Sequence, residues 1–112
     1  MVMKMSNRSI QFSNECILNG IIKKPPVFRK LVNDSEQCIV VLETIGLDGN
    51  HVNLRLVSFD QAVIDSIKAL GLEESDAVRV QAILDVVRWL DIRSQMNKSR
   101  QSVIIQRLEK QV

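Results

Sequence analysis

Alternation of apolar and polar side chains dominates this chain and predicts a protein built mainly of β-strands. Gly20 marks a bend or bulge in the first strand, and Pro25-Pro26 is expected to end that strand. Asp48-Gly49-Asn50 predicts a tight turn that joins the second and third strands in a hairpin. The predicted strands span Glu15–Ile22, Gln37–Ile45, His51–Phe59, Ala77–Val87 and Ser102–Leu108.

One stretch of the chain changes from this two-residue period to a helical one. Asp60 is suited to cap the N-terminus of a helix, and Gly71 is suited to end it. The spacing between them predicts a helix of about three turns. Its apolar stripe consists of Val63, Ile64, Ile67 and Leu70.

Two segments rich in lysine and arginine interrupt the strand pattern and are expected to be loops. Lys23–Lys30 follows the first predicted strand, and Asp91–Gln101 precedes the last one. The second segment contains no glycine or proline, and we expect it to be a mobile basic loop.

Five strands with a single helix between the third and the fourth is the element order of the OB-fold, a small five-stranded Greek-key barrel. We therefore expect an all-β protein with one short helix. An N-terminal extension, 1–13, would precede one OB-fold domain, 14–112. In that fold the two basic segments would bracket one surface.

The length of the chain predicts a single domain, and its charges are divided between two basic ends and an acidic middle. The chain has 112 residues, of which 46% are hydrophobic, and this is enough for one core but not for two full domains. Residues 1–30 carry six basic side chains and one acidic one (+5), residues 31–87 three and ten (−7), and residues 88–112 six and two (+4). A fold that joins the two basic flanks would create a surface for a polyanion.

The remaining composition argues against membrane insertion, secretion and catalysis. Met1–Ser13 lacks the apolar core of a signal peptide, so a cytoplasmic protein is expected. Cys16 and Cys38 lie among apolar neighbours and are expected to be reduced, buried thiols. His51 and two distant cysteines form no recognisable metal-ligand or catalytic pattern. We expect no metal, no cofactor and no enzymatic activity.

Trp89, the only tryptophan, stands at the end of the fourth predicted strand. A flat aromatic ring with cations nearby suits a nucleic-acid base and its phosphates. The alternative interpretation is a tryptophan that packs in the core. The neighbouring cations are Arg88, Arg93, Lys98 and Arg100.

Several short motifs keep a common spacing along the chain: Asn14-x-x-Ile17-Leu18-x-Gly20-x-Ile22 with Pro26 and Arg29, then Arg55 and Phe59, then Val78-x-Val80 and Arg88-Trp89-x-Asp91. Together, from about Asn14 to Leu108, they resemble the bacterial single-stranded DNA-binding proteins. Aromatic residues on the strands of that family stack with bases. The resemblance implies this role for Trp89 and Phe59.

The chain also departs from that family. Asn53 stands where the family usually has a tryptophan, Ala82 replaces a glycine of the fourth strand, and the short turn 46–50 lacks the aromatic residue of the family's loop. The acidic tail through which the family recruits repair and replication proteins has no counterpart in this sequence, which implies that this recruitment is lost. The chain therefore resembles a DNA-binding domain without further segments, similar in this respect to the related primosomal replication protein B.

Some candidate residues have two interpretations. Phe59 either stacks on a base or packs on Ile64 beside the helix cap, and Arg55 is either a phosphate ligand or a solvated charge. Phe28 is expected on the surface as a further stacking ring, rather than folded back onto the barrel. The full candidate DNA-binding set is Trp89, Phe59, Arg55, Phe28, Lys23, Lys24, Arg29, Lys30, Arg88, Arg93, Lys98 and Arg100.

The sequence leaves two candidate functions open, and they belong to different classes. One is largely sequence-independent binding of single-stranded DNA in replication, recombination or repair, and the other is a protein-interaction module of a replication or primosome complex. We also expect a homodimer or homotetramer, because the apolar side chains of the first and last strands exceed what one barrel interior holds. These side chains are Leu18, Ile21, Ile22, Val103, Ile104 and Ile105.

Overall fold

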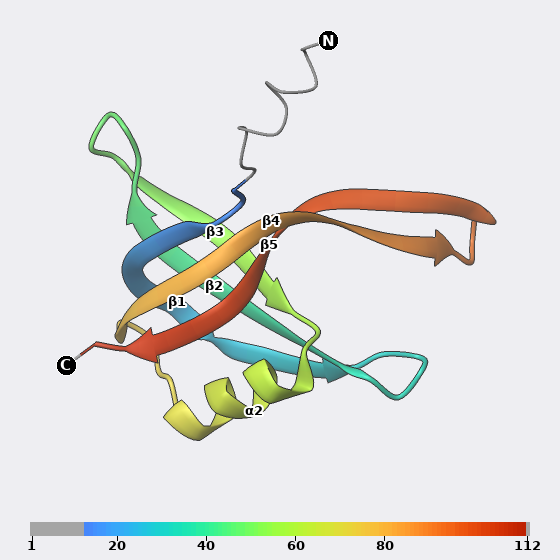
Figure 1. Ribbon diagram of the computed structural model, residues 1–112, viewed down its shortest axis with the longest axis horizontal. Helices are drawn as coiled ribbons and strands as arrows, with labels where there is room; N and C mark the ends of the chain where they lie inside the picture. The colour runs from blue at the N-terminus through green and yellow to red at the C-terminus, as the bar shows by residue number, and fades with distance from the viewer. Residues whose placement is uncertain (1–12, 112) are drawn as a thin grey trace, which may run out of the picture.

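A computed structural model describes residues 13–111, and in it five strands close into one barrel with a single helix (Figure 1). The strands follow one another around the barrel in the order β1-β2-β3-β5-β4. All neighbours pair antiparallel except β3 and β5, whose short contact is parallel. The elements are β1 (Cys16–Lys30), β2 (Glu36–Ile45), β3 (His51–Ser58), α2 (Gln61–Leu70), β4 (Ala77–Asp91) and β5 (Met96–Lys110). The expected fold class, an OB-fold barrel with one short helix, is confirmed.

The barrel is filled by every second side chain of its strands, as the two-residue period requires. The interior side chains are almost wholly removed from solvent, and the helix contributes Ile64 and Ile67 to the same core. From the strands come Ile22, Cys38, Val40, Leu42, Leu56, Val78, Val80, Ala82, Ile105 and Leu108.

The ends of α2 follow from the two residues that the sequence singles out. The Asp60 carboxylate accepts hydrogen bonds from the backbone N–H groups of Ala62 and Val63, which satisfies two of the free donors of the first turn. Gly71 adopts φ 58°, the left-handed conformation that ends many helices. The predicted helix is confirmed. It is also too short to span a membrane, and no other helix occurs in residues 13–111.

β1 does not end at the prolines, and this corrects the expected loop at 23–30. The strand continues through Pro25 and Pro26 to Lys30, paired with β2. Its register shifts between Ile22 and Lys24 and again between Lys24 and Val27. Such irregular pairing tolerates residues that lack an N–H donor, and it bends the strand around the barrel.

Gly20 permits a close approach between the backbones of β1 and β2. A Cβ atom at this position would overlap the backbone carbonyl oxygen of Glu43. Only a residue without a side chain fits beneath that carbonyl. The pairing of β1 with β4 is regular through Gly20, and the register shifts of β1 lie further along the strand, after Ile22.

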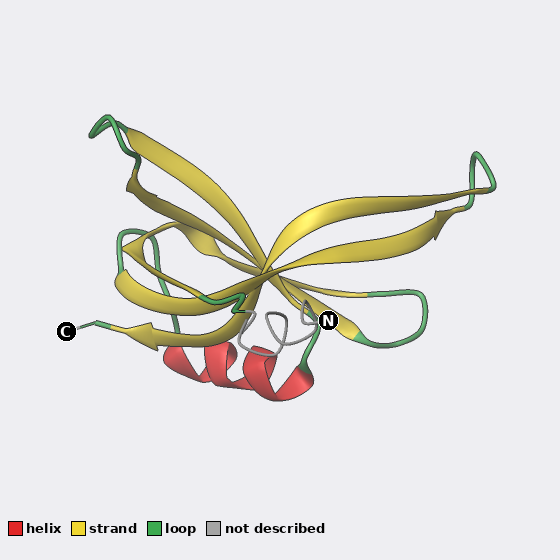
Figure 2. Cartoon of the chain, turned by 45° about the horizontal axis from the view of Figure 1, so that its top comes forward, coloured by secondary structure: helices red, strands yellow, loops and turns green. Residues whose placement is uncertain are grey.

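β4 and β5 also run further than the sequence pattern predicts. β4 loses its contact with β1 after Ala82, and β5 loses its contact with β3 at Val103. Beyond these residues the two strands pair only with each other, as a two-stranded ribbon that projects from the barrel (Figure 2). We call residues 84–91 with 96–103 the ribbon. The expected mobile loop 91–101 is wrong, because only residues 92–95 connect the strands.

The two cysteines are free thiols on different parts of the sheet. Cys38 lies opposite Phe28 in the β1–β2 ladder and is buried. Burial raises the pKa of its thiol to about 11. Cys16 lies opposite Ala82 in the β1–β4 ladder and is half-buried. Cys38 matches the expected buried thiol, whereas Cys16 matches it only in part.

Candidate nucleic-acid interface

The strand register defines one continuous outer surface of the barrel. Because Cys38, Val40 and Leu42 point inward, their neighbours Ile39 and Val41 point outward. Residues directly opposite each other in a sheet share a face. Val41 lies opposite Lys24 on one side and Arg55 on the other.

The same surface continues over β5 and β4. Ile39 lies opposite Val57, which neighbours Ile104 of β5, and Ile104 in turn lies opposite Ile83 of β4. Two-residue steps from these positions place Arg100 opposite Val87, and Lys98 opposite Trp89, on the same side. We call this surface the outer face. It contains Lys24, Val27, Arg29, Ile39, Val41, Arg55, Val57, Ile83, Asp85, Val87, Trp89, Lys98, Arg100, Ser102 and Ile104.

Three arginines from three different strands converge on the outer face. Burial lowers the pKa of the Arg55 guanidinium from its ordinary value, and the positive charges of Arg100 and Arg29 lower it further. Arg29 donates from Nε to Oε1 of Gln37 at 3.2 Å. Within residues 13–111, none of the three arginines forms an ion pair with a carboxylate. We call these residues the arginine triad. A cluster of like charges without a counterion favours an anion between them.

Trp89 lies on the ribbon and is 43% exposed, so it is not a core residue. Lys98 lies opposite it and forms an ion pair with Asp91 at 3.0 Å. Hydrogen bonds from Lys98, Arg93 and Ser94 lower the pKa of the Asp91 carboxyl, which also fixes the turn of the ribbon. A shallow hollow of about 530 Å³ surrounds the ring, lined by Arg88, Trp89, Leu90, Asn97, Lys98 and Ser99.

The two other candidate aromatic residues differ in placement. Phe28 folds back onto the core, and its ring centroid lies 5.2 Å from the Lys68 ammonium, so the expected surface role is wrong. Its position opposite the buried Cys38 explains this, because the continued strand turns it inward. Phe59 directly follows β3 and is 38% exposed, which leaves part of its ring open to solvent.

The remaining candidate cations do not all gather on the outer face. Lys23 forms an ion pair with Glu43 at 3.8 Å, and Lys30 lies opposite Glu36 on the side of the helix. Arg88 follows the alternation of β4 to the other face of the ribbon, and Arg93 lies in the turn 92–95. The structure therefore places Lys24, Arg29, Arg55, Trp89, Lys98 and Arg100 on the same side of the sheet, and these are a subset of the predicted residues.

Sequence reasoning missed an apolar stripe that crosses the outer face between Arg29 and Arg55. Val27, Ile39, Val57 and Ile104 follow one another across four strands of the outer face. The signal was present in the continuous apolar run of β2, where Ile39 and Val41 break the alternation expected of a strand with a polar outer face. Val57 is buried, whereas Val27, Ile39 and Ile104 keep part of their surface exposed beside the cations, which suits the bases and phosphates of a polynucleotide.

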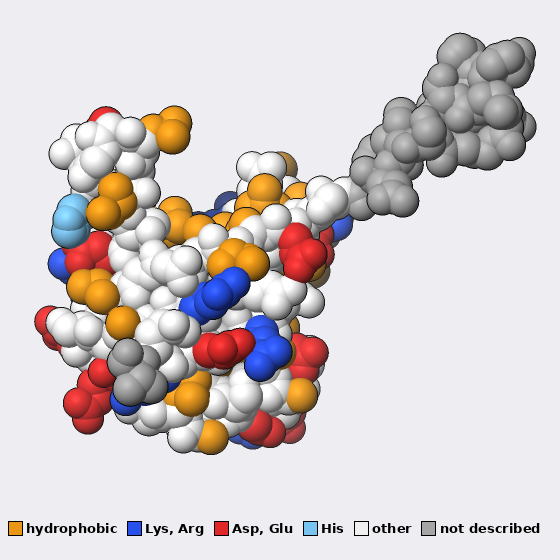
Figure 3. Space-filling view, turned by 60° about the vertical axis from the view of Figure 1, so that its left-hand side comes forward, with side chains coloured by type: hydrophobic (Ala, Val, Ile, Leu, Met, Phe, Trp, Pro, Cys, Tyr) orange, Lys and Arg blue, Asp and Glu red, His pale blue; other side chains and the backbone are white. Residues whose placement is uncertain are grey.

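Hydrophobic side chains also reach the surface on the β2–β3 hairpin, away from the arginine triad (Figure 3). Ile45 and Leu47 are largely exposed near its tip. Directly after the turn of this hairpin His51, the pale-blue residue of Figure 3, lies 3.1 Å from the Glu43 carboxylate. In the described part of the chain, no three His, Cys, Asp or Glu side chains are grouped so as to hold a metal ion.

Comparisons with known proteins give structural neighbours only. No protein-family model and no curated protein matches the sequence. Among solved structures, a Plasmodium falciparum SSB in complex with ssDNA has a TM-score of 0.66 and 19% identity, with 92% of this chain and 98% of that chain covered. The dimeric N-terminal domain of the PriB protein from Thermoanaerobacter tencongensis has a TM-score of 0.62 and 15% identity, with 88% and 97% covered. At these identities the likeness establishes the fold, and the chain is therefore an OB-fold protein built like these two structures over nearly its whole length.

Proposed function

We propose that the protein binds single-stranded DNA without catalysis and with little sequence preference. The observation that carries this proposal is the combination of the arginine triad and the half-exposed Trp89 on one continuous outer face. Two solved structures with this fold support it, since one is an SSB complex with ssDNA and the other is a PriB domain.

The proposed chemistry divides the outer face into two parts. The guanidinium groups of the arginine triad bind phosphate oxygens and release condensed counterions, which gives affinity without sequence information. The ring of Trp89 stacks on a base, and every base offers a π-face, so this contact also tolerates any sequence. The partly exposed side chains of the apolar stripe, Val27, Ile39 and Ile104, pack against sugars and bases.

We further propose that the protein acts in DNA replication, recombination or repair and that its working unit is a homodimer or homotetramer. The PriB domain is described as dimeric, which supports self-association. Ile22 and Ile105 belong to the core, and Leu18 and Val103 pack against it, so these four side chains are used inside the barrel and not at a subunit interface. Ile17, with 52% of its surface exposed, remains an apolar residue of β1 available for contact.

Binding of a labelled, unstructured oligonucleotide tests the proposal when two double variants are compared. Arg55→Gln/Arg100→Gln removes two cations of the outer face. Arg79→Gln/Arg107→Gln removes the same charge from the part of the sheet where β4 pairs with β1, away from the ribbon, where these residues line a small hollow with Ile17, Gln81 and Glu109. We expect the first variant alone to lose most of its affinity, with the slope of log affinity against log salt reduced by about 1.4 for two phosphates.

Equal losses in both double variants would show only non-specific attraction to a basic protein. No binding by the unmodified protein would overturn the proposal and favour the protein-interaction module. A duplex of the same sequence serves as the competitor, because its stacked bases are closed to Trp89.

A further inference from the structure

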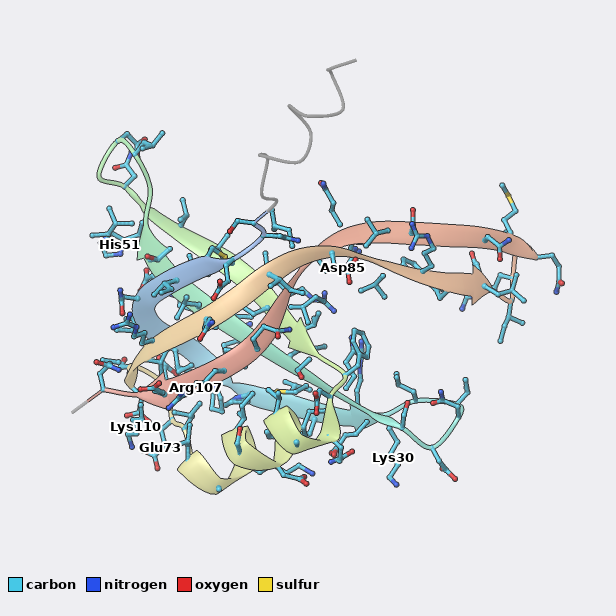
Figure 4. The ribbon with its side chains drawn as sticks, viewed as in Figure 1. Lys30, His51, Glu73, Asp85, Arg107 and Lys110 are labelled. Carbon is cyan, nitrogen blue, oxygen red and sulfur yellow. The ribbon has the colours of Figure 1, made fainter. Side chains whose placement is uncertain are left out.

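Asp85 places a negative charge on the face that we propose to bind DNA. It lies where β4 leaves the barrel and enters the ribbon (Figure 4), and its side chain stands on the outer face between those of Ile83 and Val87. The other charged residues of the outer face are all lysine or arginine. A carboxylate repels phosphate groups, so at this position it suits a part of the nucleotide other than the backbone.

The Asp85 carboxylate is held in place but is not neutralised. Its Oδ1 accepts a hydrogen bond from the backbone N–H of Val86 at 2.7 Å, and the side chain is exposed. Within residues 13–111, no lysine, arginine or histidine forms an ion pair with it. A carboxylate has acceptor sites on both oxygens, so the bond from Val86 leaves room for further donors from a ligand.

The strand register places Asp85 in one row with Arg55. Asp85 lies opposite Ser102 of β5, and one step back along the parallel pairs of β3 and β5, Ser102 lies beside Arg55. The two charged residues are therefore two strand spacings apart, about 10 Å, with the small side chain of Ser102 between them. A nucleotide carries its phosphate at one end and the polar edge of its base at the other. One nucleotide can thus reach from Arg55 to Asp85.

Apolar side chains surround the carboxylate on the outer face. Ile83 and Val87 flank Asp85 along β4, and Ile104 is its diagonal neighbour on β5. All three are partly exposed, so a base can lie against them with its edge toward the carboxylate. Contacts with the flat side of a base tolerate any sequence, whereas hydrogen bonds to its edge distinguish one base from another. Asp85 is therefore placed to read a base.

We propose that Asp85 selects guanine at one position of a bound single strand. The proposal rests on the proposed function and adds a single preferred base to its otherwise low sequence preference. A carboxylate accepts hydrogen bonds and donates none. The Watson–Crick edge of an unpaired guanine carries two adjacent donors, N1–H and the N2 amino group, which match the two oxygens of Asp85. Cytosine and adenine carry an amino group beside an acceptor nitrogen, and thymine has one N–H between two carbonyl groups. Guanine alone can bind both oxygens at once.

Fluorescence anisotropy with two labelled strands of about 12 nucleotides tests the proposal. Both strands alternate thymine with a purine, which is guanine in one and hypoxanthine in the other. Hypoxanthine keeps the purine ring and N1–H but lacks the N2 amino group, so stacking on Trp89 is matched. We expect the guanine strand to bind about threefold more tightly, because a bidentate pair discriminates by roughly five- to tenfold and only half of the binding registers bring guanine to Asp85.

Asp85→Asn should abolish the difference between the two strands. Its amide offers one acceptor oxygen, and its NH2 group would oppose the amino group of guanine. The same variant should bind oligo(dT) more tightly than the parent, because a charge that repels phosphates is removed. An asparagine oxygen can still accept from the N–H of Val86, so the local structure is retained. Asp65→Asn, a change at an exposed residue of α2, is the matched control and should keep the preference for guanine.

Equal binding of the guanine and hypoxanthine strands by the parent would overturn the role of Asp85 and leave the proposed function intact. A preference for guanine that survives Asp85→Asn would do the same, because Asp85 would then only hold the backbone of Val86. Loss of the preference in Asp65→Asn as well would assign it to overall charge and not to this site. If the parent binds neither strand nor oligo(dT), the proposed function fails and the role of Asp85 fails with it.

Discussion

Arg55 of β3 and Arg100 of β5 lie on the same face of the barrel, close enough that the charge of Arg100 adds to burial in lowering the pKa of the Arg55 guanidinium. Neither forms an ion pair with a carboxylate of the described chain. A protein that holds such groups together without a counterion accepts repulsion in the free state, and an anion that binds there relieves it. This relationship gives the phosphate-binding part of the proposed function its clearest test.

Arg55→Gln should reduce the slope of log affinity for single-stranded DNA against log salt by about 0.7, the effect of one lost phosphate contact. The measurement is a titration of a labelled oligonucleotide at several salt concentrations. Arg79→Gln is the matched control, because it removes the same charge from the surface that Ile17 and Gln81 line. An unchanged slope for Arg55→Gln would remove Arg55 from the phosphate site.

Trp89→Ala should weaken single-strand binding by about 1–3 kcal/mol, the usual effect of losing one stacked base. Leu90→Ala is a close control, since Leu90 is the next residue, is 55% exposed and lies on the other face of the ribbon. Fluorescence anisotropy of a labelled oligonucleotide measures both. If the two variants lose the same affinity, the effect belongs to the ribbon as a whole and not to the tryptophan ring.

Gly20→Ala should destabilise the fold by about 1–3 kcal/mol, because the new Cβ collides with the backbone carbonyl of Glu43 and not with a movable side chain. Urea unfolding gives the change. Gly46→Ala is the control, as the nearest atoms to its Cβ would lie 3.5 Å away, at ordinary contact distance. Equal stability of both variants would mean that β1 shifts away from β2 at little cost.

The pH dependence of stability should include a contribution from Glu36, which joins β2 to α2. Hydrogen bonds from Gln61, and then from Lys68, lower the pKa of this carboxyl below its ordinary 4.5. A lowered pKa in the folded state means that the stabilisation is present above the unfolded value and is lost as the pH falls through the folded value. Glu36→Gln should therefore unfold at a lower temperature than the parent near pH 7, and the difference should shrink below pH 4.5.

Thermal unfolding of the parent and of Glu36→Gln across this pH range checks the prediction. Glu74→Gln, a change at an exposed residue in the connection after α2, should leave the unfolding temperature unchanged. A difference between the parent and Glu36→Gln that grows as the pH falls would contradict the sign.

The local signals in the sequence predicted those elements whose causes are local. The cap Asp60, the helix end at Gly71 and the turn at Asp48-Gly49-Asn50 each act within a few residues, and the structure contains all three. The β2–β3 pairing followed from the short turn. The OB-fold followed because the order of elements leaves few ways to close a small barrel.

The errors fall where long-range pairing overrides local composition. Pro25 and Pro26 usually end a strand, but β2 keeps β1 in place across two register shifts. The ribbon is exposed on both faces, so its residues from Arg88 to Arg100 show little of the apolar alternation that marks a strand against a core. The prediction for Phe28 failed because it assumed that β1 ends at the prolines. In the continued strand, the alternation of side chains turns Phe28 towards the core.

The central claim, that the outer face binds single-stranded DNA through Trp89, is tested most directly by the fluorescence of this residue. The chain has a single tryptophan, so its emission reports on this one ring. We predict that an unstructured oligonucleotide quenches the emission in a saturable manner, and that added salt restores it because the phosphate contacts are lost. Emission that stays unchanged at saturating oligonucleotide would contradict the claim.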